Sequence, residues 1–224
     1  MFIARNPDET FDMKLYHGTS VTFLAETQRH GIRPRMDRSS NWKEAPSHPE
    51  MVYLTDAYPF YYATMSREKP CVVFEIDAAQ LDHRLLHPDE DYLYHLMYQR
   101  DRKLPTKAQH QRLCADLDMF QHMWTKSLVF LGNCAYRGTI PRKAITRYCQ
   151  FDSAKRPELT AYCMDATISL LNYELQGPEL QKMVAWFFGD RKLLPMVAES
   201  ETPQERKLWM AQSKDRTGID VVEL

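Results

Sequence analysis

The sequence of 224 residues lacks an excess of charge of either sign, and it lacks long apolar runs. Its 29 Lys and Arg residues almost balance its 30 Asp and Glu residues, which gives a formal net charge of −1. Binding to nucleic acid through the overall charge is therefore not indicated, and any such contact must come from a local basic patch. The apolar runs are far shorter than a membrane-spanning helix requires, so no membrane association is expected.

The sequence also lacks a signal peptide and closely spaced cysteine pairs. The N-terminal stretch MFIARNPDETFDM is polar and acidic, without the apolar centre of a secretory signal. The five cysteines are odd in number, and no two are spaced as in a metal-binding or redox motif. These absences predict free thiols, no metal site and a cytoplasmic location.

Apolar and aromatic residues are plentiful. Hydrophobic residues make up 44% of the chain and aromatic residues 12%, which is enough for a substantial core. Runs of apolar residues bounded by turn residues predict strands, and the last of these ranges holds two strands joined by a proline turn: 13–17, 51–55, 70–77, 127–132 and 133–152.

The remaining segments are predicted to be mainly helical. Ser20 is expected to cap a helix over residues 21–30. A helical insertion is predicted over about 82–127, within a first domain that spans 1–152. Residues 153–224 are predicted to form a small helical extension packed on that domain.

Five short segments follow one another in an order that carries the main functional signal. His-Gly-Thr lies in KLYHGTS at 14–20, a helix then ends in HGI, and a polar loop leads to VYLT. A strand that ends in EID follows, and later an aromatic residue precedes GTIP. This order resembles the ADP-ribosyltransferase superfamily, and its layout is closest to the catalytic half of tRNA 2′-phosphotransferases. The resemblance covers about residues 14–150, interrupted by the insertion.

The resemblance implies both a fold and a co-substrate. Members of the superfamily have an α+β fold in which a split, strongly curved pair of antiparallel β-sheets with flanking helices grips NAD. We therefore expect this fold here, with the helical insertion and the C-terminal helical appendage added to it.

The resemblance also implies which residues hold NAD. His17 would hydrogen-bond the adenosine ribose, Gly18 would meet the nicotinamide carboxamide through its backbone, and Thr19 would support the turn. Tyr53 would stack on nicotinamide, and Tyr62 would complete the pocket. Glycine allows such a close approach of backbone to ligand, and tyrosine combines a flat apolar ring with a hydroxyl. The alternatives are a turn histidine at His17 and core packing for both tyrosines.

The late strand lacks the glutamate of classical members, which bonds the nicotinamide ribose and favours the oxocarbenium ion. The segment NCAYRGTIP offers Asn133, Tyr136 and Arg137, and the last two are expected on the acceptor side. Glu75 in FEID is left aside, because this strand ending is commonly structural. Without the glutamate, chain-building polymerase activity is not expected. Single transfer, phosphate-acceptor chemistry and a catalytically silent protein remain open.

The polar loop at 29–43 is basic, and the resemblance implies that it covers the donor. Arg33 and Arg35 are expected to bind the NAD pyrophosphate, because guanidinium forks fit phosphate oxygens. A solvated polar loop is the alternative interpretation. A local basic patch of this kind would also let the protein meet a nucleic-acid acceptor.

Together these features predict an NAD-dependent mono-ADP-ribosyltransferase that transfers ADP-ribose to a protein or nucleic-acid acceptor. By analogy, its role would be that of a toxin or effector. One alternative is an RNA 2′-phosphotransferase-like enzyme that uses NAD. Few residues precede His17, so the N-terminal domain of tRNA 2′-phosphotransferases is not expected. The other alternative is a silent member that binds a nucleotide or partner. The C-terminal helices could present a surface for a protein partner.

Overall fold

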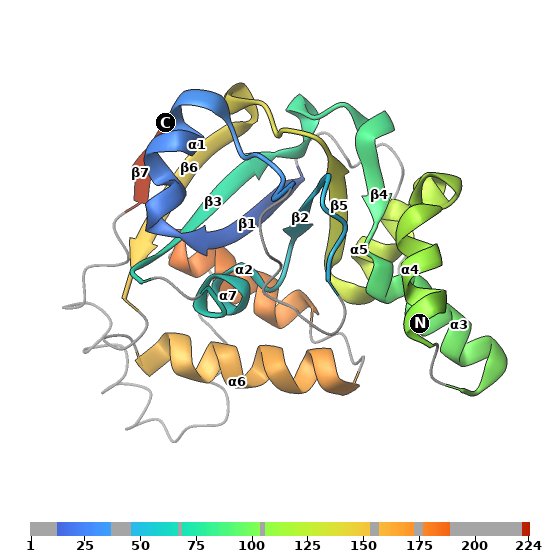
Figure 1. Cartoon of the computed structure of the whole chain (residues 1–224). Helices are drawn as coiled ribbons and strands as arrows, with labels where there is room; N and C mark the ends of the chain where they lie inside the picture. Colours follow the sequence, from blue (N-terminus) through green and yellow to red (C-terminus); the bar gives the residue numbers. More distant parts are fainter. Residues whose placement is uncertain are drawn as a thin grey trace, which may run out of the picture.

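The structure is a computed structural model that describes residues 13–36, 46–66, 69–103, 106–152, 157–172, 177–188 and 221–224. Within these residues, seven antiparallel strands form one sheet in the order β4-β5-β2-β1-β3-β6-β7 (Figure 1). The strands are β1 Lys14–Ser20, β2 Met51–Thr55, β3 Cys71–Asp77, β4 Leu86–Pro88, β5 Asn133–Arg137, β6 Ile145–Phe151 and β7 Val221–Glu223. The fold is α+β, as the sequence predicts.

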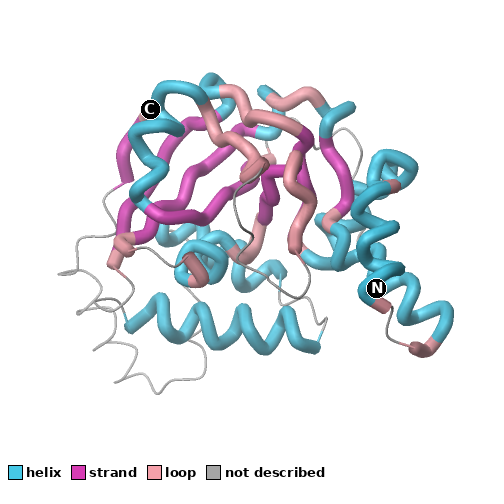
Figure 2. Tube along the Cα trace, viewed as in Figure 1, coloured by secondary structure: helices cyan, strands magenta, loops and turns pink. Residues whose placement is uncertain are grey.

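Most of the α-helices lie below the sheet or beyond its β4 end, whereas α1 (Leu24–His30) lies elsewhere, at the upper left of the view (Figure 1 and Figure 2). The α-helices of the described residues are α1 Leu24–His30, α2 Pro59–Thr64, α3 Glu90–Asp101, α4 Lys107–Ala115, α5 Trp124–Leu131, α6 Pro157–Asn172 and α7 Gly177–Phe187. Short 3-10 helices span Val21–Phe23, Ala78–Gln80, His83–Leu85, Leu117–Met123 and Arg142–Ala144.

One face of the sheet packs against α2, α6 and α7 (Figure 1). Tyr16 and Val73 of the sheet lie in one buried cluster with Phe60 of α2 and Tyr162 of α6. The rings of Phe60 and Tyr162 meet edge to face, with centroids 5.8 Å apart. The C-terminal helices α6 and α7 therefore share a core with the sheet.

The opposite face carries a second core, because side chains alternate along each strand. Leu15 and Phe74 lie there with Trp124, at the start of α5. A third, smaller cluster joins Tyr92 of α3 and Leu131 of α5 to the sheet beside β2 and β5. The insertion thus covers the end of the sheet that carries β4, and β4 itself comes from the insertion.

The predicted strand at 127–132 is wrong, because these residues belong mainly to α5. Trp124, Leu128 and Leu131 are all buried, and their spacing of four and three residues places them on one helix face. Gly132 ends this helix with a φ of 70°, and its N–H donates to the Leu128 carbonyl. A run of six mostly apolar residues fits a buried helix as well as a strand, so its length alone misled the prediction.

The other predicted elements are largely confirmed. Strand β2 has the predicted bounds of 51–55, β3 begins one residue later than predicted, and β5 and β6 both lie within 133–152. The Ser20 side chain accepts a hydrogen bond from the Thr22 N–H, 3.2 Å away, and so caps the helical turn that leads into α1. The strand predicted to stop at residue 17 instead continues to Ser20.

Candidate functional site

Strands β1 and β2 meet at one end and then separate (Figure 1). β1 pairs with β3 along all 7 of its residues, whereas its register with β2 consists of the single pair Tyr16 and Thr55. An antiparallel continuation would place His17 opposite Leu54 and Gly18 opposite Tyr53. These pairs are not formed, so the sheet opens at the His-Gly-Thr segment.

His17 spans this opening with its side chain. Its Nδ1 lies 2.9 Å from the main-chain oxygen of Tyr53, and because a carbonyl oxygen only accepts, Nδ1 carries a proton. Burial lowers the pKa of His17, although its hydrogen bond to the backbone opposes this. The neutral ring therefore presents Nε2 as an acceptor. No hydrogen bond to Nε2 occurs within the described part of the chain, so this nitrogen is available to a ligand hydroxyl.

Gly18 and Thr19 belong to β1 and are not part of a turn. A Cβ built on Gly18 would lie 2.1 Å from the Pro59 carbonyl oxygen and 2.7 Å from the Ala63 nitrogen, both in α2. The close approach that requires glycine is therefore, in this structure, the approach of α2 to the strand. Thr19 pairs with Val72 of β3 in the sheet.

Tyr53 is held by its hydroxyl between a loop and α3. The hydroxyl donates to the carboxylate of Glu90, with both carboxylate oxygens 2.6 Å away. It also accepts a hydrogen bond of 2.7 Å from the main-chain N–H of His48. Burial, followed by the nearby acidic side chains, raises the pKa of Tyr53 well above its usual value. The phenol thus stays protonated and its ring is fixed in place next to the opening.

Glu90 and its neighbours form an acidic segment that the sequence argument missed. Glu90 is buried at the first position of α3, and Asp89 before it caps the helix by accepting from the Asp91 N–H. Burial raises the pKa of Glu90 to about 7 and that of Asp91 above its ordinary value. Asp91 is nevertheless exposed to solvent. Protein atoms surround its carboxyl group but leave part of the residue's surface open. The Asp-Glu-Asp run at 89–91 is the signal in the sequence that could have indicated this segment.

Tyr62 reaches from α2 to the late strand. Its hydroxyl accepts a hydrogen bond of 2.7 Å from the Asn133 side-chain nitrogen, at the start of β5. Burial, followed by Asp89 and Asp91, raises the pKa of Tyr62 well above its usual value. Asn133 Oδ1 is buried and has no hydrogen-bond partner among the described residues. Asn133 thus brings an unused acceptor to the strand that lacks the expected glutamate.

The two arginines of the basic loop have different surroundings. Arg33 is half exposed and pairs with Glu26 at 3.2 Å. Arg35 donates to the carbonyl oxygens of Ser47, at 2.5 Å, and Met36, at 3.3 Å. Arg35 therefore lies next to the loop that binds Tyr53, whereas Arg33 pairs with Glu26 of α1. Residues 37–45 of the basic loop lie outside the described residues.

Tyr136 and Arg137 are held by structural partners of their own. Tyr136 pairs with Val52, so it lies on the opposite face from Tyr53, where it is buried in the core. The Arg137 guanidinium forms ion pairs with Glu50 and Asp118 at 2.8 and 2.7 Å. These two residues therefore have structural partners and leave the acceptor side without an assigned group.

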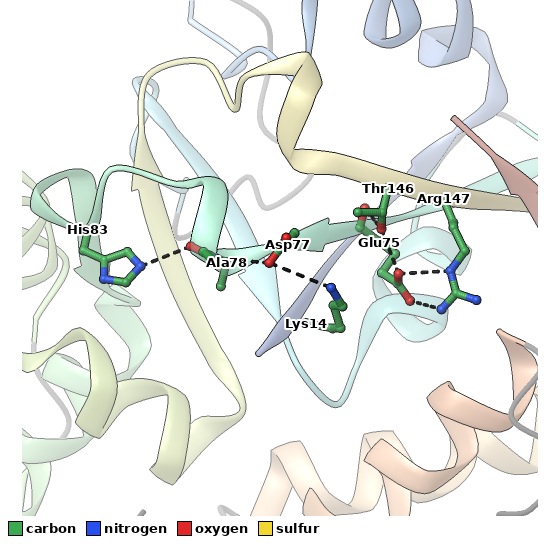
Figure 3. Close-up of polar contacts among 8 residues, drawn as sticks. Lys14, Glu75, Asp77, Ala78, His83, Thr146 and Arg147 are labelled. Atoms are coloured by element: carbon green, nitrogen blue, oxygen red, sulfur yellow. Dashed lines mark hydrogen bonds and ion pairs between the residues drawn. The ribbon is translucent and has the colours of Figure 1, made fainter. Parts of the chain in front are cut away.

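Glu75 is also engaged in a structural contact. Its carboxylate is buried and accepts from Arg147 Nε at 3.0 Å and from the Thr146 hydroxyl at 2.7 Å (Figure 3). These contacts tie β3 to β6 (Figure 3). The structure thus supports leaving Glu75 out of the candidate site.

Comparisons with known proteins add no assignment. No protein-family model matches the chain, and no curated protein sequence matches it significantly. In the part of the chain that the structure describes, no helix is long and apolar enough to cross a membrane.

Proposed function

We propose that the protein is an NAD-dependent mono-ADP-ribosyltransferase. The observation that carries this proposal is the opening between β1 and β2, where His17 bonds the Tyr53 main chain and its Nε2 has no hydrogen bond within the described residues, while Glu90 holds the Tyr53 hydroxyl. An acceptor nitrogen suits a ribose hydroxyl, and an aromatic ring suits the flat nicotinamide. The residues expected from the superfamily resemblance therefore support the donor half of the reaction.

The proposed reaction proceeds by loss of nicotinamide. The bond between the ribose C1 and the nicotinamide nitrogen breaks, and the leaving group takes the electron pair and becomes neutral. The acceptor nucleophile then forms a bond to the same carbon and releases its proton to water. Holding the donor in place and stabilising the positive charge on the ribose would supply most of the rate acceleration.

The residues have separate roles in this proposal. His17 binds a ribose hydroxyl, and Tyr53 contacts the nicotinamide side. Glu90 is a positioning residue, because its carboxylate holds the Tyr53 hydroxyl. Asn133 supplies a neutral acceptor near Tyr62, so the strand carries no carboxylate to support repeated transfer to ADP-ribose itself.

Labelled NAD tests the proposal. The purified full chain is incubated with NAD labelled on the adenylate and with lysate, and label on macromolecules and free nicotinamide are both measured. We expect label on protein or nucleic acid and a matching release of nicotinamide. His17→Ala should lower both by at least about tenfold, since it removes a group that contacts the donor. His122→Ala, which changes an exposed histidine, should leave both unchanged.

The same assay separates the alternatives. Formation of ADP-ribose 1″,2″-cyclic phosphate only when 2′-phosphorylated RNA is added would favour the phosphotransferase-like reaction and contradict the proposal. Absence of nicotinamide release in every condition, with NAD still raising the melting temperature, would favour a silent nucleotide-binding protein.

A further inference from the structure

Three side chains with metal-binding atoms meet where α3 and α4 pack together. They are Glu90 of α3 and His110 and Cys114 of α4, and one ligand atom of each lies within 4.8 Å of the other two. The Cys114 sulfur and His110 Nδ1 are 3.9 Å apart. Glu90 and His110 are buried, and Cys114 is half-buried.

The helices bring these residues together in a simple way. His110 and Cys114 are four residues apart, so they lie one turn apart on the same face of α4. The His110 ring packs edge to face on Tyr94 of α3, with centroids 6.2 Å apart. Glu90 is fixed from the other side, because it accepts the hydrogen bond from Tyr53. The His110 ring and the Glu90 carboxylate are thus oriented by contacts that do not depend on a metal.

Their spacing is close to that of a tetrahedral zinc site. Zinc binds histidine nitrogen and carboxylate oxygen at about 2.0–2.2 Å and thiolate sulfur at about 2.3 Å, so its ligand atoms are roughly 3.3–3.8 Å apart. The Cys114 sulfur and His110 Nδ1 are 3.9 Å apart, and no two of the three ligand atoms are more than 4.8 Å apart. Side-chain adjustments of less than about 1.5 Å would therefore bring them to the spacing of a zinc site.

The surroundings are short of positive charge. Asp89, Glu90 and Asp91 all lie at the start of α3, and in the described part of the chain no ion pair involves any of them. A divalent cation would offset this accumulation of acidic groups, two of which, Asp89 and Glu90, are buried.

We propose that Glu90, His110 and Cys114 bind one zinc ion, with water or the exposed Asp91 in the fourth position. A set of one oxygen, one nitrogen and one sulfur donor suits zinc and does not suit magnesium or calcium, which prefer oxygen ligands. The hydrogen bond from Tyr53 to Glu90 is the kind of outer contact that orients a metal-binding carboxylate. The ion would therefore join α3 and α4 to the candidate site. This inference does not depend on the proposed transferase activity.

Cobalt substitution tests the site directly. The full chain is stripped of metal with a chelator, passed through a desalting column and titrated with Co²⁺. We expect one equivalent to bind and to produce the near-ultraviolet charge-transfer band of a cobalt–thiolate bond, which Zn²⁺ then abolishes. Absence of the band, or its persistence after excess Zn²⁺, would overturn the proposal.

Variants assign the band to the proposed ligands. Cys114→Ser should remove the band, and His110→Gln should weaken Co²⁺ binding by at least tenfold. Cys163→Ser and His122→Gln are the matched controls, since these residues lie outside the cluster, and both should bind like the wild type. Retention of the band in Cys114→Ser would contradict the assignment.

Thiol alkylation provides a test in the unaltered protein, in case a ligand variant fails to fold. The metal-free chain is treated with iodoacetamide with or without Zn²⁺, and peptides that carry Cys114 and Cys163 are quantified by mass spectrometry. Zn²⁺ should slow alkylation of Cys114 at least tenfold and leave half-buried Cys163 unchanged. Equal rates at Cys114 with and without Zn²⁺ would refute zinc binding through this thiol.

Discussion

Gly18 shows how one residue can be explained by a ligand or by the fold. Its place after His17 suggests a backbone that a dinucleotide can approach. In the structure the nearest neighbours of an added Cβ are the Pro59 oxygen at 2.1 Å and the Ala63 nitrogen at 2.7 Å. Both belong to the backbone of α2, so neither can move like the end of a flexible side chain. The requirement for glycine therefore follows from packing, whether or not NAD also binds there.

We predict that Gly18→Ala lowers the free energy of unfolding by about 3 kcal/mol or more, because α2 must move away from β1. Gly138→Ala is the matched control: Gly138 has a φ of 83°, and an added Cβ would meet no atom within 4 Å. That change should lower the free energy of unfolding by about 1–2 kcal/mol, because alanine must adopt the left-handed backbone conformation but meets no steric clash. Urea denaturation of both variants measures the difference, and equal losses would contradict the packing explanation.

The partners of Tyr53 mark the limit of residue-level prediction. His17 and Tyr53 were identified from short motifs, and the structure connects them through the Tyr53 carbonyl. Glu90 was not identified, although it binds the Tyr53 hydroxyl. The two residues are 37 positions apart, and no local pattern reports a contact between a strand and the first turn of a distant helix.

At the scale of elements, Arg35 connects the segment that follows α1 to the segment that precedes β2, near Tyr53. Its guanidinium donates to the Ser47 carbonyl, and the next residue, His48, donates its N–H to the Tyr53 hydroxyl. Arg33 lies outside this chain of contacts and pairs with Glu26. The sequence predicts that both arginines bind the pyrophosphate, whereas in the structure they have different partners.

We predict that Arg35→Ala raises the KM for NAD about tenfold through loss of charge-assisted hydrogen bonds, each of which contributes about 1.5–3 kcal/mol. Arg33→Ala should change KM less than about twofold, since an exposed ion pair contributes little. Steady-state nicotinamide release measures both, on the basis of the proposed activity. A larger effect of Arg33→Ala would show that Arg33 provides the phosphate contact.

Helix α5 explains why an element can be assigned to the wrong class. The segment SLVFLG is apolar on nearly every side, so neither a period of two nor one of 3.6 stands out. Its buried residues Trp124, Leu128 and Leu131 contact different clusters of the core. Packing against these surrounding elements and the helix end at Gly132 stabilise the helical conformation. The 3-10 helix that precedes α5 is likewise not indicated by the sequence.

At the scale of the whole molecule, the sheet depends on segments from both ends of the chain. The face that carries Tyr16 and Phe151 is covered by Tyr162 of α6 and Val184 of α7. β7, at Val221–Glu223, pairs with β6 at the edge of the same sheet. The helical extension predicted after residue 153 thus contributes to the main core.

We predict that a chain ending at Asp152 does not fold by itself, because this truncation exposes the apolar face of the sheet. It should bind the dye ANS and show no cooperative thermal transition, whereas the full chain should bind little dye and melt sharply. Calorimetry and dye fluorescence, compared at equal protein concentration, test this. A sharp transition in the shortened chain would show that residues 1–152 form an independent domain.

The sequence by itself determined the α+β class, most of the strands, the Ser20 cap and the positions of His17 and Tyr53. These features depend on residue periodicity, capping chemistry and short motifs, which act over a few neighbouring residues. Only the tertiary structure decided that β1 and β2 separate at His17, that Glu90 holds Tyr53, and that Glu90, His110 and Cys114 meet. These contacts join residues far apart in the chain, and the packing of whole elements sets their distances.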